Sequence, residues 1–536
     1  MRGARAVFVL CIGAVAIGAA TLRLPRLSLR PMHGDEANQA VKTARLLETG
    51  QYVYDPHDHH GPSIYYLAQP VFWALGAETA PDLTDGMLRV VPAVFGVLTV
   101  VLLVLMGDGL GRAAAVCAGV LTAVSPALVF YSRYYVQETL LVCFTFGFIA
   151  TAWRYAVTRK VVWAVAAGAC LGLMHATKET WVLAGAAMAA ALAVLLLWDR
   201  LAAGRRDADT VRRVDARACF RPVVIALVIA VAVVVAGVLF TSFFTNWRGP
   251  IDSVLTYTYN AGKAGGESIH NHPVLWYLKM LTFSRLVTDM PGPWWSEGLV
   301  LGLALVGLVA ALTGRGLGNT HRGLARFVGL YTVFLTVAYA LIQYKTPWCC
   351  IGFLHGMALM AGIGAVALVR WVPTRLLKVL LVLALAAGAV HLGWQAHRAS
   401  FRFCVDQRNP YVYAHTSPDA MKLVRRVEEV AEVSPDGYGM IVKVITPTNY
   451  WPLPWYLRRF EPGHVGYYHE VPDDPDASVI ITSPDCAEAI EARAKQSYNR
   501  MSTYGLRPGV LMSVWIRQPL WDALVETWTG RTPPAG

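Results

Sequence analysis

Two neighbouring carboxylates open the first polar segment of this sequence. Asp35 and Glu36 occur in "HGDEANQ", directly after the first apolar run. An ionised carboxylate at the edge of a lipid bilayer could take a proton from a hydroxyl group and act as a general base. The structural alternative is that Asp35 is the N-cap of a helix that begins here. The two roles are compatible, and the sequence leaves both open.

A second group of acids and imidazoles follows in "YDPHDHHGPS". Imidazole and carboxylate groups are ligands of divalent metals, so a metal site is one interpretation of this group. A hydrated loop tip is the other, because the spacing is irregular and forms no known ligand pattern. The candidate metal ligands are His57, Asp58, His59 and His60.

An amphipathic helix is expected between these two groups, over residues 36–49. Ala37, Ala40 and Leu47 fall on one face at helical spacing, while charged residues fall on the other. Gly50 follows as a suitable C-cap. Such a helix would lie along the outer leaflet. Asp35 would then stand near its N-terminus, where the helix dipole favours an ionised carboxylate.

The elements that must position these residues are mostly membrane spans. The chain has 536 residues, of which 55% are hydrophobic and only 15% are charged, against about 25% charged in soluble proteins. A helix needs roughly 20 apolar residues to cross a bilayer. About eleven runs approach this length: 5–22, 87–107, 113–131, 139–157, 161–176, 181–198, 222–244, 298–313, 324–343, 349–370 and 375–393. A polytopic α-helical membrane protein is therefore predicted.

The C-terminal part has a different pattern. Helical periodicity over 419–433 and 486–496 alternates with short strand-like runs over 439–446, 477–483 and 510–517. This pattern predicts a small α/β domain. We therefore expect a transmembrane domain over 1–398 and a second domain over 399–536 that ends in a loose tail. The pieces "NPYVYAHT" and "PLPWYLR" are expected to dock the second domain and help to close the site.

The basic residues indicate how the chain is oriented. The net charge is +12, but Arg and Lys gather in short loops between alternate spans, as the positive-inside rule predicts for cytoplasmic loops. A nucleic-acid binder would instead concentrate its charge on one folded module, so no nucleic-acid partner is expected. A cytoplasmic N-terminus in the plasma (inner) membrane places these segments outside: 23–86, 132–138, 175–180, 245–297, 343–348 and the chain after 394.

Two smaller questions concern the first span and the cysteines. The first apolar run could be a cleaved signal peptide, but an uncleaved span is favoured because many spans follow. The nine cysteines include no CxxC pair and no zinc spacing. Cys404 and Cys486 could form a disulfide in the C-terminal domain or could remain free thiols.

Four of the expected outer segments carry acids, cations and aromatic residues. The first is the loop with the acid pair, and the others are "YSRYYVQE", "HATKET" and "YKTPWCC". Ionisable residues at membrane depth are costly and commonly mark a functional site. The outer loop 245–297 is rich in Gly, His, Tyr and Trp and would suit a segment that covers a substrate.

These motifs, in this order, resemble those of the GT-C glycosyltransferases, polytopic enzymes that use polyprenyl-phosphate sugars. "GDEA", "HGPSIYYLAQPVFWALG", "LRVVPAVFG", "YSRYYVQETLL", "TKET" and "YKTPWCC" resemble the protein O-mannosyltransferase and aminoarabinose-transferase branch. With "NPYVYAHTSPD" and "YWPLPWYLR", the chain looks most similar to the prokaryotic flippase-activity-associated proteins. The resemblance covers nearly the whole chain.

The resemblance implies roles for individual residues. Asp35 corresponds to the catalytic acid that deprotonates an acceptor hydroxyl, and Glu36 to a neighbour that orients donor or acceptor. The expected donor-phosphate ligands are Arg133, Lys178 and Lys345. The implied substrate-binding residues are His60, Tyr65, Tyr66, Arg89, Tyr134, Glu138 and Trp348. Where the family commonly has Lys-Gly, this chain has Lys178-Glu179, which leaves the role of Glu179 open.

The implied reaction is transfer of a sugar, with inversion, from a polyprenyl-phosphate donor to a glycan, lipid or protein acceptor. A departing polyprenyl phosphate gains negative charge, which Arg or Lys in a water-poor site would stabilise. No cofactor is required, and a divalent metal stays possible. The alternative function is a lipid-linked-sugar translocase or its partner. A transporter should carry polar residues at mid-membrane and show repeats, which this sequence does not display.

Overall fold

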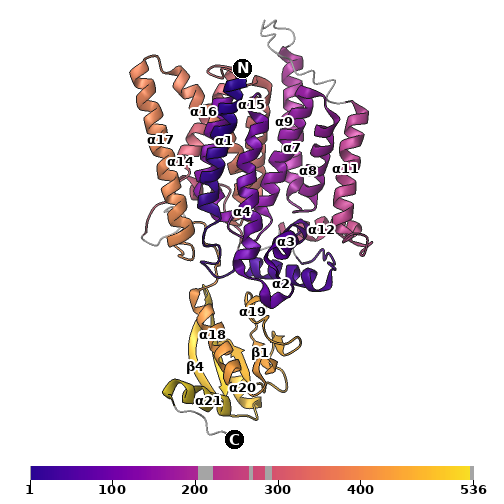
Figure 1. The fold of residues 1–536 in the computed structure, drawn as a ribbon, viewed down its shortest axis with the longest axis vertical. Helices are drawn as coiled ribbons and strands as arrows, with labels where there is room; N and C mark the ends of the chain where they lie inside the picture. Colours follow the sequence, from indigo (N-terminus) through magenta and orange to yellow (C-terminus); the bar gives the residue numbers. More distant parts are fainter. Residues whose placement is uncertain (1, 59, 203–220, 265–269, 284–291, 531–536) are drawn as a thin grey trace. The chain divides into compact units, whose positions relative to one another are not determined.

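Long apolar helices make up most of the chain in the computed structural model, which describes residues 2–58, 60–202, 221–264, 270–283 and 292–530 (Figure 1). The chain divides into two units. The first comprises residues 1–27, 51–71 and 86–413, and the second comprises 28–50, 72–85 and 414–536. The predicted domain boundary between residues 398 and 399 stays a prediction.

The predicted spans are helices. Their bounds are α1 Arg2–Arg23, α4 Asp85–Val101 with the 3-10 turn η2 Leu102–Met106, α5 Arg112–Val124, α7 Glu138–Thr158, α8 Val161–His175, α9 Trp181–Ala202, α11 Pro222–Phe240, α14 Gly298–Thr313, α15 Arg322–Leu341, α16 Ile351–Trp371 and α17 Arg375–His397. Within the described residues, eight helices are long and apolar enough to cross a membrane, and three shorter apolar ones accompany them. The predicted polytopic fold is confirmed.

Helix α16 is the packing centre of the first unit, in contact with α5, α14 and α15. Its approach to α14 depends on glycine. A Cβ atom added to Gly364 would lie 1.9 Å from the carbonyl oxygen of Leu303, and one on Gly307 would lie 2.0 Å from that of Met360. Small residues let membrane helices pack backbone to backbone in this way.

Shorter elements connect these helices. They are α3 Ser63–Leu75, α6 Pro126–Tyr131, α12 Gly249–Ala264, α13 Trp276–Thr282, the 3-10 turn η4 Pro347–Cys350 and the π-helical turn η5 Arg398–Arg402. Helix α12 begins the segment that was expected to cover a substrate. That expectation stays a prediction, and part of the segment lies outside the described residues.

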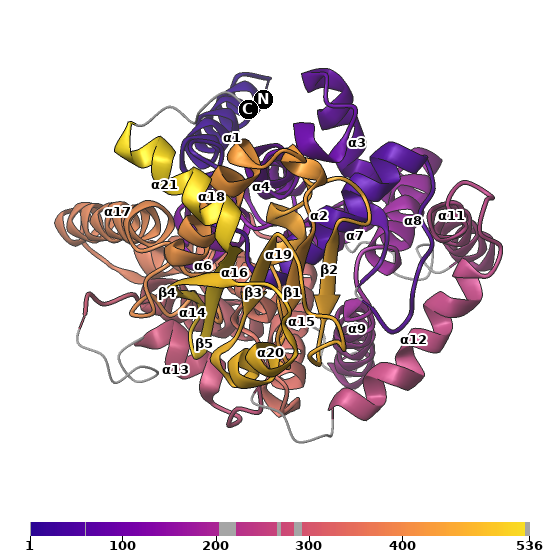
Figure 2. The same ribbon diagram turned by 90° about the horizontal axis from the view of Figure 1, so that it is seen from below.

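The second unit contains a five-stranded sheet of order β2-β1-β3-β5-β4 (Figure 2). Its strands are β1 Val442–Ile445, β2 Val465–Tyr468, β3 Val479–Thr482, β4 Tyr498–Arg507 and β5 Val510–Arg517. β1 pairs with β2 and β3 in parallel, whereas β5 pairs with β3 and β4 antiparallel. β1, β3 and β5 lie where the sequence predicts strands, and β2 and β4 were not predicted.

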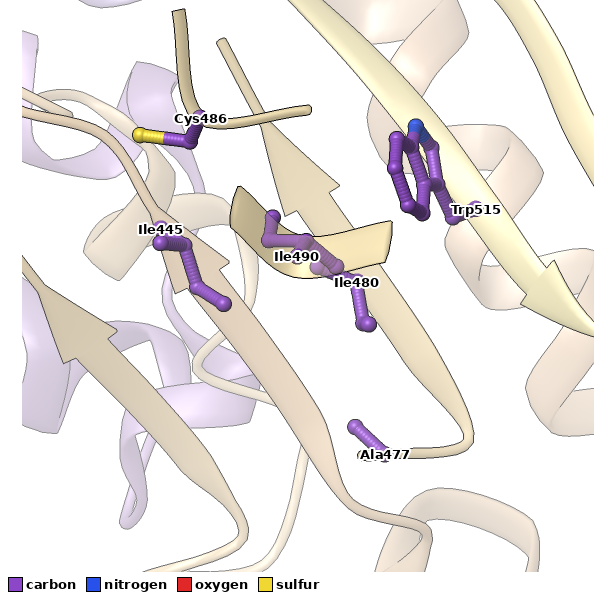
Figure 3. Packing of buried hydrophobic residues seen from close by; sticks show 6 residues of the cluster. All are labelled: Ile445, Ala477, Ile480, Cys486, Ile490 and Trp515. Carbon is purple, nitrogen blue, oxygen red and sulfur yellow. The ribbon is translucent and has the colours of Figure 1, made fainter. Parts of the chain in front are cut away.

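Helix α20 Ala487–Arg493 contributes Ile490 to a hydrophobic cluster of this sheet. Figure 3 shows its members: Ile445, Ala477, Ile480, Cys486, Ile490 and Trp515. Helix α18 Pro418–Val433 begins at the N-cap Ser417 and packs against β4, as does α21 Gln518–Thr529. Neither Cys404 nor Cys486, both among the described residues, is in a disulfide, so the disulfide interpretation is wrong.

The second unit also contains the predicted amphipathic helix, α2 Gly34–Thr49. Gly50 ends it in the left-handed conformation with φ 67°, as a C-cap requires. The short helix α19 Leu453–Tyr456 packs against α2, and so does the 3-10 turn η1 Ala80–Asp82. The segment with the acid pair and the C-terminal α/β domain therefore belong to one unit.

Candidate functional site

The loop before α2 sets the position of the acid pair. His33 is the N-cap. Its ring Nδ1 accepts a hydrogen bond from the Asp35 backbone N–H at 3.1 Å, and its backbone N–H donates to Glu36 Oε2 at 2.9 Å. The interpretation of Asp35 as the N-cap is therefore wrong. The His33 side chain caps the helix instead, and the reciprocal bond to Glu36 completes a capping box.

Glu36 and Asp35 have different environments. Glu36 is fully buried, and its Oε2 also accepts a hydrogen bond from Arg30 Nη1 at 2.6 Å. The Asp35 side chain is 46% exposed, and its Oδ2 lies 3.8 Å from His33 Nδ1. Asp35 is in the first turn of α2, where the helix dipole favours its ionised form. The geometry gives Glu36 a holding role and leaves the Asp35 carboxylate accessible.

In the first unit, Lys178 and Glu138 form a buried ion pair. Lys178 lies in the turn between α8 and α9, Glu138 is the first residue of α7, and Lys178 Nζ donates to Glu138 Oε1. Burial alone would lower the pKa of Lys178, but the Glu138 carboxylate raises it above its usual range. Lys178 is therefore charged, and its charge is balanced within the protein.

A pocket adjoins this ion pair. Its walls come from α7, α9, α15, η4 and α16, and most of them are apolar. The polar groups among the lining residues are Glu138, Thr145, Lys178, Thr180, Tyr331, Tyr339, Cys349 and His355. Trp348 also lines the pocket. The structure thus brings together three residues from the expected site: Glu138, Lys178 and Trp348. The pocket therefore combines mostly apolar walls with one internally balanced ion pair.

The two predicted arginine ligands contact the chain that follows the first span. Arg133 Nη1 donates to the carbonyls of Arg23 at 2.7 Å and Pro25 at 2.8 Å, and its Nη2 donates to Arg26 O at 3.1 Å. Arg89 is fully buried and donates to Leu27 O at 2.7 Å. Both guanidinium groups therefore hold residues 23–27 by their backbone.

Lys345 is also bonded to backbone. Its Nζ donates to His272 O at 3.0 Å and to Ile342 O, and the side chain is almost completely buried. Burial lowers the pKa of Lys345. This cation ties the segment around His272 to the turn before η4.

The histidine-rich loop docks on the turn that carries Lys178. His60 Nδ1 lies 2.7 Å from Glu179 Oε2, and Tyr54 OH donates to Glu179 Oε1 at 3.4 Å. Burial would raise the pKa of Glu179, but His60 and the bond to it lower the value below its usual range. Glu179, whose role the sequence left open, is therefore a partner of His60.

The same loop was a candidate metal site. The described residues contain no group of three or more His, Cys, Asp or Glu side chains placed to hold a metal ion, and His59 lies outside them. The His57 ring instead contacts Tyr259, with ring centroids 3.9 Å apart. A divalent metal stays a prediction.

The predicted aromatic residues fall in two places. Tyr134 and Trp348 both contact the ring of Tyr131, with centroids 5.5 and 6.3 Å away. Tyr65 is buried against Tyr52, and Tyr66 bonds to the hydroxyl of Ser242 at 2.5 Å. Tyr134 and Trp348 thus lie in one aromatic group near the pocket, while Tyr65 and Tyr66 anchor α3.

Sequence reasoning missed six of the eight polar residues of the pocket, among them two tyrosines and a histidine of the spans. Tyr331 and Tyr339 come from α15 and His355 comes from α16. His355 is buried, and its Nε2 has no hydrogen-bond partner among the residues that the structure describes. A histidine inside an apolar span is the signal that could have identified it.

Both the fold and part of the sequence resemble known proteins. Residues 63–206 match the sequence profile of the family described as dolichyl-phosphate-mannose-protein mannosyltransferase. ArnT from Cupriavidus metallidurans bound to undecaprenyl phosphate matches with a TM-score of 0.59 and 14% identity, over 94% of this chain and 97% of that one. The chain has the fold of ArnT. It is an integral, multi-pass membrane protein.

Two further comparisons are consistent with this result. ArnT in the apo state gives a TM-score of 0.60 at 14% identity, over 95% of this chain and 98% of that one. The oligosaccharyltransferase of Archaeoglobus fulgidus, tethered to an acceptor peptide, gives 0.53 at 13% identity, over 93% and 73%. No curated protein matches the chain. The resemblance to flippase-activity-associated proteins stays a prediction.

Proposed function

We propose that the protein is an integral-membrane glycosyltransferase that moves a sugar from a polyprenyl-phosphate donor to an acceptor hydroxyl at the extracytoplasmic face. The observation that carries this proposal is the likeness, over 94% of the chain, to ArnT bound to undecaprenyl phosphate. The match of residues 63–206 to a mannosyltransferase family supports it independently. The acceptor is a hydroxyl of a glycan, a lipid or a protein.

In the proposed reaction Asp35 is the general base. Its carboxylate takes the proton of the acceptor hydroxyl while the acceptor oxygen attacks the anomeric carbon. The bond between that carbon and the phosphate oxygen breaks, and the polyprenyl phosphate leaves with the bonding electrons. Attack opposite the leaving group inverts the anomeric centre. The exposed carboxylate in the first turn of α2 supports this role.

The pocket of the first unit supports binding of the donor. Its apolar walls suit an isoprenoid chain, and Lys178 offers a positive charge for the phosphate. Glu138 already neutralises Lys178, so a phosphate must compete with this carboxylate for the ammonium group. Arg133 and Lys345 are proposed to add positive potential while they hold backbone segments.

Sugar transfer in membranes tests the proposal. Membranes that contain the wild type, Asp35→Asn or the control Asp473→Asn receive a radiolabelled polyprenyl-phosphate sugar and an envelope extract as acceptor. Asp473 is an exposed acid of the second unit and tests for a general effect of lost charge. We expect transfer by the wild type and the control, and a loss of about 10²–10⁴-fold with Asp35→Asn. Equal transfer by Asp35→Asn, or movement of the lipid donor without transfer, would refute the proposal.

A further inference from the structure

The residue three positions before Asp35 is held by the C-terminal part of the chain. Met32 is fully buried. Its backbone N–H donates to the hydroxyl of Tyr456 at 2.7 Å, and its carbonyl accepts from Thr416 Oγ1 at 2.6 Å. Both backbone groups of one loop residue are therefore fixed by side chains more than 380 positions away in sequence.

The Tyr456 hydroxyl is itself fixed. It donates to Asp85 Oδ2 at 2.8 Å, and the other oxygen of that carboxylate accepts from Trp455 Nε1, also at 2.8 Å. One hydroxyl thus accepts from Met32 and donates to Asp85. Phenylalanine would fill the same space but could make neither bond.

The segment that carries Tyr456 is anchored beside it. Arg458 donates to Ala80 O at 2.9 Å, to Trp455 O at 2.7 Å and to Leu83 O. Its guanidinium carbon lies 3.7 Å from the centre of the Trp455 ring. Residues 453–458 and 80–85 are therefore tied together by side chains from both segments. This gives Tyr456 a fixed support.

The contacts continue toward the acid pair. The rings of His33 and His415 meet edge to face, with centroids 5.5 Å apart. A Cβ atom on Gly34 would lie 3.4 Å from Trp451 Cβ. Residues 32, 33 and 34 each have a neighbour from the C-terminal part, and Asp35 is the next residue.

We propose that residues 415–458 position the loop that carries Asp35, and that Tyr456 is a positioning residue for the general base. This inference rests on the proposed function. A catalytic group must be held within about 0.5 Å of its productive place, and a shift of about 1 Å can reduce the rate about a hundredfold. The C-terminal domain is thus a working part of the site.

Tyr456→Phe in the full-length protein tests the proposal. We expect kcat to fall about tenfold or more, because Asp35 loses its alignment, while the KM for the lipid donor stays within about twofold. The amide of Met32 should exchange with deuterium faster, which peptides covering residues 30–36 report by mass spectrometry. Tyr438→Phe is the matched control, because this tyrosine of the same unit packs against Phe460, with ring centroids 5.1 Å apart.

A pair of substitutions at Thr416 covers the case in which Tyr456→Phe destabilises the fold. Thr416→Ser keeps the bond to Met32 O and should retain the wild-type kcat. Thr416→Val removes the bond and should lower kcat with little change in KM. An unchanged kcat in both Tyr456→Phe and Thr416→Val would overturn the proposal, as would equal losses in Thr416→Ser and Thr416→Val.

Asp35→Asn separates this failure from a failure of the proposed function. If Asp35→Asn keeps full activity, the proposed function is wrong, whatever Tyr456 does. If Asp35→Asn is inactive while Tyr456→Phe keeps the wild-type kcat and the wild-type exchange at residues 30–36, only the positioning role is wrong.

Discussion

At position 35 a half-exposed carboxylate stands beside the fully buried carboxylate of Glu36. The sequence predicts a shared role for the pair, but the two side chains have different contacts. Glu36 binds Arg30 and the backbone of His33, and so fixes the first turn of α2. Asp35 lies in this fixed turn, and its side chain is 46% exposed. A buried acid and an accessible acid should respond differently to substitution.

The first prediction compares these two acids by thermal unfolding of the purified protein in detergent. Glu36→Gln leaves the buried Arg30 guanidinium without its counter-charge and should cost about 3–5 kcal/mol of stability. Asp35→Asn, at a half-exposed side chain in the first turn of α2, should cost less than about 1 kcal/mol. A Glu36→Gln protein with the same melting temperature as the wild type would contradict the holding role of Glu36.

The ion pair of Lys178 and Glu138 gives the second prediction. Lys178→Met leaves a buried carboxylate unpaired and should cost about 3–5 kcal/mol, whereas the double variant Lys178→Met/Glu138→Leu should recover most of that loss. Thermal unfolding of the two variants measures the difference. If the double variant is as unstable as the single one, the charge balance at this pocket is not the source of the effect.

At the scale of elements, the loop that precedes α3 is fixed by close backbone contact. Ser63 N–H donates to Ala176 O at 2.9 Å, and a Cβ atom on Gly61 would lie only 2.3 Å from that oxygen. The third prediction is that Gly61→Ala forces the loop from the turn before α9 and costs about 1–3 kcal/mol. Gly302→Ala, near the start of α14 with open space around it, is the control. Equal melting temperatures for the two variants would contradict this docking.

The contact between α6 and α14 should be sensitive to pH. Glu297, the N-cap of α14, accepts from Ser125 Oγ at 2.7 Å and from Ala127 N–H at 3.0 Å. Burial raises the pKa of Glu297 to about 7 from the ordinary 4.5. The folded protein therefore binds this proton more tightly than the unfolded chain does.

The fourth prediction is that the free energy of unfolding falls as the pH rises, because the folded state binds the Glu297 proton more tightly. The stability that Glu297 contributes is fully present below about pH 4.5 and is lost as the pH rises through about 7, by up to about 3 kcal/mol. Glu297→Gln should remove this part of the pH dependence and melt above the wild type at pH 8. Melting temperatures at pH 6 and pH 8 test it, and parallel changes in both proteins would contradict it.

The spans and the end of α2 could be predicted because the sequence signals for them are local. Apolar runs of about 20 residues become spans, and Gly50 ends α2 where its backbone freedom is needed. β4 was missed because polar and apolar residues mix along "YNRMSTYGLR". The choice of His33 over Asp35 as N-cap depends on a reciprocal bond with Glu36, which helix-start patterns did not identify.

The partners of the cations could not be predicted, because they depend on contacts between distant segments. Arg133 and Lys345 were expected to contact a phosphate, and each binds backbone carbonyls. Such carbonyls carry no signal in the sequence, since every residue has one. Their roles toward a donor phosphate stay predictions, as does the convergence of Asp35 with Arg133, Lys178 and Lys345.

At the scale of the whole molecule, the chain combines a helical membrane unit with a second unit that contains both the acid loop and the α/β domain. The fold of ArnT extends over 94% of the chain at 14% identity, so a shared arrangement of elements coexists with extensive change of side chains. The acid loop and the pocket of the membrane unit are the parts that the proposed reaction requires.

Release of free polyprenyl phosphate by the purified protein is the most direct test of the account. The protein in lipid nanodiscs is mixed with a polyprenyl-phosphate sugar and an envelope acceptor, and the lipid product is quantified over one turnover. The account predicts equimolar polyprenyl phosphate and glycosylated acceptor from the wild type, and a rate about 10²–10⁴-fold lower from Asp35→Asn with unchanged donor binding. The same rate from both proteins would contradict it.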